Sequence, residues 1–117
     1  MEQHLGPLTT KEGFNRVEEY VEEAKSRSAE TLLGRRKPSG AEFEKGYFFD
    51  PTILVNVDHT MKLVKNETFG PMVPIMPFKT FDEVIEEAND TEYGLVSYIY
   101  TGDLGKILTT FSMSTCF

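Results

Sequence analysis

Residues 72–101 read MVPIMPFKTFDEVIEEANDTEYGLVSYIYT, and this stretch decides the fold class that we expect. Met72–Phe78 is an apolar run of strand length, although Pro74 and Pro77 interrupt it. Thr80 and Glu83 have the spacing of a capping box, in which each side chain satisfies a backbone donor at the start of a helix. The apolar residues that follow recur at helical intervals: Phe81, Val84, Ile85 and Ala88.

A second strand is expected soon after this helix. Asn89–Gly94 has the composition of a turn, and Leu95–Thr101 is rich in aromatic and β-branched residues. Strand, helix and strand in this order form a βαβ unit, which pairs its strands in parallel through a right-handed crossover. We therefore expect the α/β class, with a mostly parallel sheet and flanking helices.

A last helix is expected to begin near Asp103 and to bury one apolar face: Leu104, Ile107, Leu108 and Phe111. In an α/β fold such a helix normally leads into another strand, but Ser112–Phe117 has no strand pattern. We therefore expect residues 1–117 to be a single truncated segment of a larger domain.

The sequence before residue 72 begins with an expected helix over Thr9–Ser26. Thr9 and Glu12 have the capping-box spacing, and one apolar stripe follows: Phe14, Val17, Val21 and Ala24. The carboxylates off that stripe are interpreted as a solvated helix face rather than as acid/base pairs: Glu18, Glu19, Glu22 and Glu23. 

Two extended segments follow this helix. Glu30–Leu33 has the pattern of a short strand, and the polar Gly34–Gly46 is expected to be a loop. Tyr47–Val57 is rich in aromatic and β-branched residues, but Pro51 cannot donate to a ladder. This segment is therefore expected to form two extended pieces or an edge strand.

Composition restricts the partners of the chain. The 117 residues carry a formal net charge of −7, which argues against nucleic acid or an anionic membrane as the main partner. The basic cluster Arg35–Lys37 is interpreted as a solvated loop. No apolar stretch approaches membrane-spanning length, and a single cysteine, Cys116, fits a reducing, cytoplasmic setting.

No side chain of the sequence stands out as a catalytic or metal-binding residue by its pattern alone. His4 and His59 belong to no recognisable nucleophile–base arrangement, and Cys116 has no positioned base near it in the sequence. Two separated histidines and one cysteine give no metal-ligand spacing. We therefore expect no catalytic residue and no metal site in this chain.

The segment Asn66–Pro71, NETFGP, is the strongest local signal. Its Gly-Pro turn lies between two apolar runs, which places Glu67 and Phe69 at the rim of a sheet, where α/β folds bind ligands. A carboxylate accepts hydrogen bonds from vicinal hydroxyls such as those of ribose, and an aromatic face suits a planar heterocycle. Glu67 could equally be a plain loop carboxylate, so the segment alone leaves both interpretations open.

This segment resembles the glutamate-x-phenylalanine-glycine-proline motif of the aldehyde dehydrogenase superfamily. Other stretches resemble that family in the same order and spacing: Gly6–Leu8 and the helix after it, Gly46–Leu54, Ala88–Leu95 and Thr101–Leu104. The resemblance runs from Gly6 to about Leu108. It implies a partial aldehyde dehydrogenase catalytic-domain fold, with a weaker similarity of Asn89–Leu95 to succinate-semialdehyde dehydrogenases.

The resemblance also implies roles. Glu67 is similar to the glutamate that holds the nicotinamide ribose hydroxyls, and Phe69 is similar to the aromatic residue beside that ribose and ring. In this family a cysteine thiolate attacks the aldehyde, a hydride passes to NAD or NADP, and the thioester is hydrolysed. The family's nucleophile, general base and dinucleotide-binding fold precede the segment that Met1 begins, and Ser112–Phe117 departs from the family's small-residue strand.

These implications lead to two hypotheses. In the first, the chain is a fragment of an NAD(P)-dependent aldehyde dehydrogenase that is inactive alone and binds neither cofactor tightly. In the second, it is a non-catalytic interaction or structural module derived from that fold. A third possibility is that the chain is a truncated piece of an acyl-CoA-forming relative. Either way, we expect self-association through exposed apolar faces, and an aldehyde substrate only in the intact enzyme.

Overall fold

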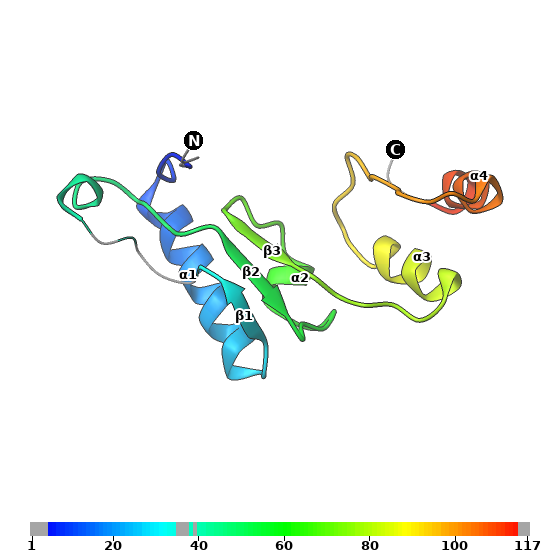
Figure 1. The fold of residues 1–117 in the computed structure, drawn as a ribbon, viewed down its shortest axis with the longest axis horizontal. Coiled ribbons are helices and arrows are strands. Elements are labelled where there is room, and N and C mark those ends of the chain that lie inside the picture. Colours follow the sequence, from blue (N-terminus) through cyan, green and yellow to red (C-terminus); the bar gives the residue numbers. More distant parts are fainter. Residues whose placement is uncertain (1–4, 35–37, 39, 115–117) are drawn as a thin grey trace. The chain divides into compact units, whose positions relative to one another are not determined.

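The computed structural model describes residues 5–34, 38 and 40–114, and it confirms the α/β class (Figure 1). The chain divides into two compact units, Met1–Met76 and Pro77–Phe117, called here the first and the second unit. Among the described residues, no helix combines the length and the apolar character needed to cross a membrane.

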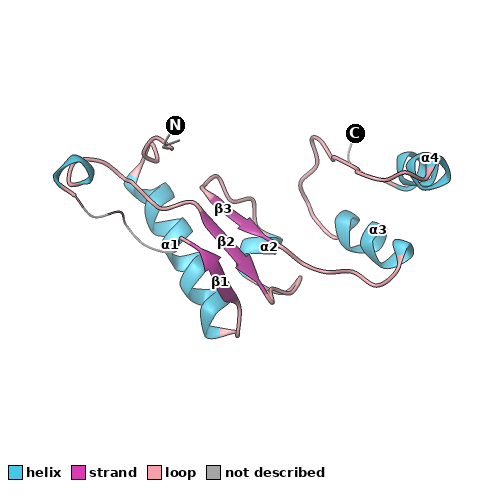
Figure 2. Ribbon diagram, in the orientation of Figure 1, coloured by secondary structure: helices cyan, strands magenta, loops and turns pink. Residues whose placement is uncertain are grey.

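The first unit packs a long helix along one face of a three-stranded sheet (Figure 2). The helix α1 spans Lys11–Ser26, and the strands are β1 (Glu30–Leu33), β2 (Thr52–Val55) and β3 (Met72–Pro74). A short helix, α2 (Lys62–Lys65), lies on the connection from β2 to β3. The expected loop before β2 also contains a 3₁₀ turn, η1, at residues Ala41–Phe43.

The sheet is mixed. Its order is β1-β2-β3, and β1 pairs with β2 in the antiparallel sense, with Thr31 opposite Leu54. β2 pairs with β3 in parallel, with Leu54 opposite Pro74. The parallel pair and the crossover through α2 therefore form a βαβ arrangement earlier in the chain than residues 72–101, where the sequence predicted one.

The N-cap of α1 lies one residue later in the chain than predicted. Thr10 is the N-cap, and its side-chain oxygen accepts a hydrogen bond from the backbone N–H of Gly13 at 3.0 Å. The prediction of a Thr9–Glu12 capping box is therefore wrong, because the neighbouring threonine takes the capping position. The predicted apolar stripe is confirmed, since Val17, Val21 and Ala24 are buried.

The core of the first unit lies between α1 and the sheet. Leu54 of the central strand is fully buried there, and Phe14 of α1 meets Phe49 edge to face, with ring centroids 5.7 Å apart. The buried cluster comprises Val17, Val21, Ala24, Ala29, Phe49, Leu54, Val57, Met61, Leu63 and Met72. These residues come from α1, β2, α2, β3 and the segments next to them, so one core joins all of these elements.

The strand β3 is shorter than the predicted Met72–Phe78. It ends at Pro74. The N–H of Ile75 makes one further hydrogen bond to the neighbouring strand, to the carbonyl of Leu54 at 2.8 Å. The missing N–H of Pro74 therefore does not interrupt the pairing with β2.

The second unit contains two helices at the positions that the sequence predicted, and the capping box of the first of them is confirmed. The helix α3 (Phe81–Asn89) has a complete capping box: Thr80 Oγ1 accepts from the Glu83 N–H at 3.1 Å, and the Glu83 carboxylate accepts from the Thr80 N–H at 3.2 Å. The helix α4 (Leu104–Met113) is capped by Asp103, which accepts from the Lys106 N–H at 3.2 Å.

Two predictions for the second unit are wrong. Leu95–Thr101 forms no strand, because no described strand of this unit offers a ladder partner. Leu104, Leu108 and Phe111 are exposed, and Thr110 is the buried residue of α4. Periodicity identifies a face that could be buried, but burial also needs an element that covers the face.

Candidate functional site

The candidate residues Glu67 and Phe69 lie on the segment that joins α2 to β3, called here the 66–71 segment. Both side chains are exposed, and Phe69 is 73% accessible although it is a large apolar residue. Thr68 and Gly70 between and after them are half-buried. This alternation is typical of an extended segment that rests one side on the protein and presents the other to solvent.

The 66–71 segment is anchored at both ends. At its start, the backbone N–H and the side-chain amide of Asn66 both donate to the carbonyl of Lys62, at 2.9 and 3.1 Å. At its end, the Pro71 carbonyl accepts from the Thr52 N–H at 2.8 Å, and the Gly70 carbonyl accepts from the Met72 N–H at 2.8 Å. Glu67 and Phe69 therefore project from a backbone fixed on α2 and on β2.

The 66–71 segment lies at the rim of the sheet, as expected, but at the edge opposite to the one where α/β sheets usually bind ligands. The 66–71 segment leads into β3, and β2 runs parallel to β3, so the segment lies at the amino ends of both strands. The general rule for open α/β sheets places ligands at the carboxyl ends. That rule therefore does not itself support a ligand site at this edge.

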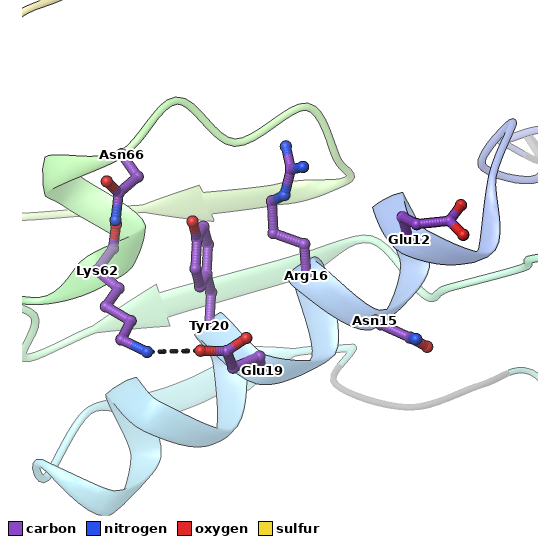
Figure 3. A pocket seen from close by; sticks show the side chains of 7 residues that line it. All are labelled: Glu12, Asn15, Arg16, Glu19, Tyr20, Lys62 and Asn66. Atoms are coloured by element: carbon purple, nitrogen blue, oxygen red, sulfur yellow. Dashed lines mark hydrogen bonds and ion pairs between the residues drawn. The ribbon is translucent and has the colours of Figure 1, made fainter.

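A shallow hollow of about 470 Å³ lies beside the start of the segment, between α1 and α2 (Figure 3). Its lining comprises Glu12, Asn15, Arg16, Glu19, Tyr20, Lys62 and Asn66. Lys62 Nζ and Glu19 Oε1 form an ion pair at 2.5 Å, and the hydrogen bond to Glu19 raises the pKa of Lys62. Two carboxylates and two cations balance in this lining, so its charge selects neither anions nor cations.

The loop before α2 is held by a hydrogen-bonded network that was not predicted from the sequence. Arg27, at the end of α1, donates to the Thr60 carbonyl at 3.0 Å and forms ion pairs with Glu23 and Asp58. Asp58 accepts from the Thr60 N–H at 2.7 Å, and the hydrogen bonds from Thr60 lower the pKa of Asp58. The Asp-x-Thr spacing of residues 58–60 is a turn signal that could have indicated it.

The remaining candidates add no chemistry in the described part of the chain. His59 is half-buried in the turn before α2. His4, Cys116 and the basic cluster Arg35–Lys37 lie outside the described residues. Across the described residues, no group of three or more histidine, cysteine, aspartate or glutamate side chains could hold a metal ion.

The whole chain can also be compared with known proteins. The sequence profile of the Aldehyde dehydrogenase family matches residues 1–116. The chain belongs to this family. The superfamily resemblance seen in the separate motifs is thereby confirmed over nearly the full length.

Individual aldehyde dehydrogenases show the same relationship. The chain is 42% identical over 103 residues to the 3,6-anhydro-alpha-L-galactose dehydrogenase of Vibrio sp. (strain EJY3), which covers 88% of this chain and 22% of that protein. It is 43% identical over 102 residues to the glutarate-semialdehyde dehydrogenase of Pseudomonas putida, and this match covers 87% of the chain and 20% of that protein. The chain thus spans about a fifth of the length of these relatives.

Solved structures confirm the fold. A 3,6-anhydro-L-galactose dehydrogenase matches 93% of this chain and 23% of its own, with a TM-score of 0.88 and 42% identity. The betaine aldehyde dehydrogenase of Staphylococcus aureus, solved in complex with NAD+, matches 96% of this chain and 22% of its own, with a TM-score of 0.85 and 34% identity. The described fold is therefore a partial aldehyde dehydrogenase fold.

Proposed function

We propose that the 66–71 segment holds the nicotinamide ribose of NAD or NADP in an NAD(P)-dependent aldehyde dehydrogenase. The observation that carries this proposal is the exposed pair Glu67 and Phe69 on a backbone anchored at both ends. The NAD+ complex of the Staphylococcus aureus relative supports the choice of ligand class.

The two side chains fit this ligand chemically. An ionised carboxylate only accepts hydrogen bonds, so Glu67 can accept from both vicinal hydroxyls of a ribose. Phe69 presents most of its ring to solvent, and a flat apolar ring suits the face of a planar heterocycle. When bound, NAD(P)+ supplies the hydride acceptor for oxidation of an aldehyde. Glu67 and Phe69 orient the group that carries out this chemistry.

The 117-residue chain alone is proposed to be inactive. Its one cysteine, Cys116, lies outside the described residues. It covers about a fifth of its relatives, so most contacts to a dinucleotide and an aldehyde would come from elsewhere. An assay of the chain with several aldehydes and NAD+ or NADP+ should show no turnover. Turnover that Cys116→Ala abolishes would contradict this proposal.

A second candidate function, a non-catalytic interaction module, is favoured by the apolar surface of the second unit. Leu95, Tyr98 and Tyr100 are all more than three-quarters exposed. Contiguous exposed apolar surface is typical of protein–protein contacts. The cofactor proposal and this alternative differ in which residues matter, because Glu67 and Phe69 belong to the first unit and the apolar residues to the second.

A chimera tests the cofactor proposal: this chain replaces the matching fifth of the Vibrio enzyme, and NAD(P)H formation is followed in a single turnover. Glu67→Gln should lower that rate by roughly tenfold or more, because a misplaced reacting group slows chemistry steeply. The affinity for the oxidised cofactor should change little, since the adenosine and pyrophosphate contacts supply most of it.

The matched control is Glu18→Gln, which makes the same chemical change at an exposed carboxylate of α1. Glu18→Gln should leave both the rate and the affinity unchanged. If Glu67→Gln behaves like Glu18→Gln, Glu67 is a plain loop carboxylate and the cofactor assignment fails.

A further inference from the structure

The 66–71 segment approaches the core helix α1 closely at Gly70. A Cβ atom placed on Gly70 would lie 2.3 Å from Cγ2 of Val17, 3.6 Å from its Cβ and 3.8 Å from its Cγ1. Val17 is fully buried in the core cluster, and its branched side chain restricts its rotation about χ1. Real atoms do not approach to 2.3 Å, and this contact therefore exists only because residue 70 is glycine.

We propose that the Gly70–Val17 contact is the device that positions Glu67 and Phe69, with Gly70 and Val17 as positioning residues. The ends of the segment are hydrogen-bonded to α2 and β2, but these hydrogen bonds do not themselves set how closely the backbone at Gly70 approaches α1. Gly70 does so, because its missing side chain lets the backbone rest on Val17. A side chain at position 70 would lift the segment and displace both exposed side chains that precede it.

The inference has a structural part and a functional part. The structural part concerns only the backbone of the first unit. The functional part, that the displaced residues no longer orient a nicotinamide ribose, rests on the proposed function. The experiment therefore has two arms, so that the failure of one part can be told from the failure of the other.

The first arm measures backbone amide exchange by NMR in the 117-residue chain. The Thr52 N–H donates to Pro71 and the Met72 N–H donates to Gly70, so both report on the end of the segment. Gly70→Ala should speed exchange at both amides by about tenfold or more, because their acceptors move away. The Leu8 N–H, which donates to Tyr47 at 2.9 Å, reports on another part of the first unit and should change far less.

A second substitution separates this contact from a general loss of folding. Val17→Ala removes both Cγ atoms, and the nearest remaining atom to a Cβ at position 70 is then the Cβ of residue 17, at the ordinary contact distance of 3.6 Å. The double variant Gly70→Ala, Val17→Ala should therefore regain slow exchange at Thr52 and Met72 relative to Gly70→Ala alone. Gly6→Ala is the control, since nothing lies within 4 Å of a Cβ there.

The second arm measures single-turnover NAD(P)H formation in the chimera. Gly70→Ala should lower the rate as Glu67→Gln does, leave cofactor affinity within about twofold, and be rescued by Val17→Ala. Unchanged exchange in Gly70→Ala, or no rescue in the double variant, would overturn the positioning role. If exchange responds and is rescued while Glu67→Gln leaves the rate unchanged, the contact stands and the proposed function fails.

Discussion

Leu54→Ala tests whether the core of the first unit is what holds the candidate site. Leu54 is fully buried at the centre of β2, and β2 pairs with β1 on one side and β3 on the other. The substitution removes buried methyl groups without adding a polar atom, so it changes core packing alone. Because Pro71 is hydrogen-bonded to the same strand, weakening β2 should also loosen the 66–71 segment.

The magnitude follows from the burial. A fully buried leucine loses its whole transfer free energy and leaves a cavity, so the free energy of unfolding should fall by about 3 kcal/mol, within a range of roughly 2–5 kcal/mol. A unit of the size of Met1–Met76 has a total stability of roughly 4–11 kcal/mol. The substitution should therefore remove a large share of that stability and lower the Tm by more than about 10 °C.

Urea unfolding followed by far-UV circular dichroism measures this change. Leu32→Ala is the matched control, because it makes the same truncation on the neighbouring strand β1 at a side chain that is 65% exposed. The control should alter stability by no more than about 0.5 kcal/mol. A loss below about 1 kcal/mol for Leu54→Ala, or equal losses for the two variants, would refute the assignment of this core.

Two further predictions concern the second unit. Hydrogen bonds from the Lys79 and Thr80 amides lower the pKa of Glu83. Its contribution to α3 is therefore complete above the unfolded pKa near 4.5 and is lost as pH falls through the lower folded value. The protection of the Lys79 and Thr80 amides against exchange, relative to their intrinsic rates, should fall in that acid range, and Glu83→Gln should abolish this pH dependence. Sedimentation at micromolar concentration should show self-association that Leu95→Lys and Tyr98→Lys weaken, whereas a clean monomer before substitution would contradict it.

Local signals in the sequence predicted the three longer helices and the capping box of α3. The Thr80–Glu83 box depends on hydrogen bonds between residues three positions apart, so spacing alone indicates it. The cap of α1 was placed one residue early, because Thr9 and Thr10 both have the right chemistry. Spacing does not decide between two adjacent threonines.

Pairing between distant residues was harder to predict. Leu95–Thr101 has the composition of a strand, but a strand exists only where a partner offers its backbone, and no described strand does so there. The mixed sheet was missed for a related reason, since nothing in the sequence of β1 fixes the direction of its partner. The Gly70–Val17 contact joins residues 53 positions apart, so the sequence around Gly70 or around Val17 does not by itself predict it.

The exposure of Glu67 and Phe69 has a physical reason. Burying a carboxylate without partners would be strongly unfavourable, so a site without its ligand keeps such a group in water. In water, however, each new hydrogen bond contributes only about 1 kcal/mol net, because it replaces one to solvent. Under the proposed function, the contribution of Glu67 comes from its position when a ligand covers the segment and excludes water, which strengthens each electrostatic interaction. The first unit can supply that position through the anchors at Asn66 and Pro71 and through Gly70, without burying either candidate side chain.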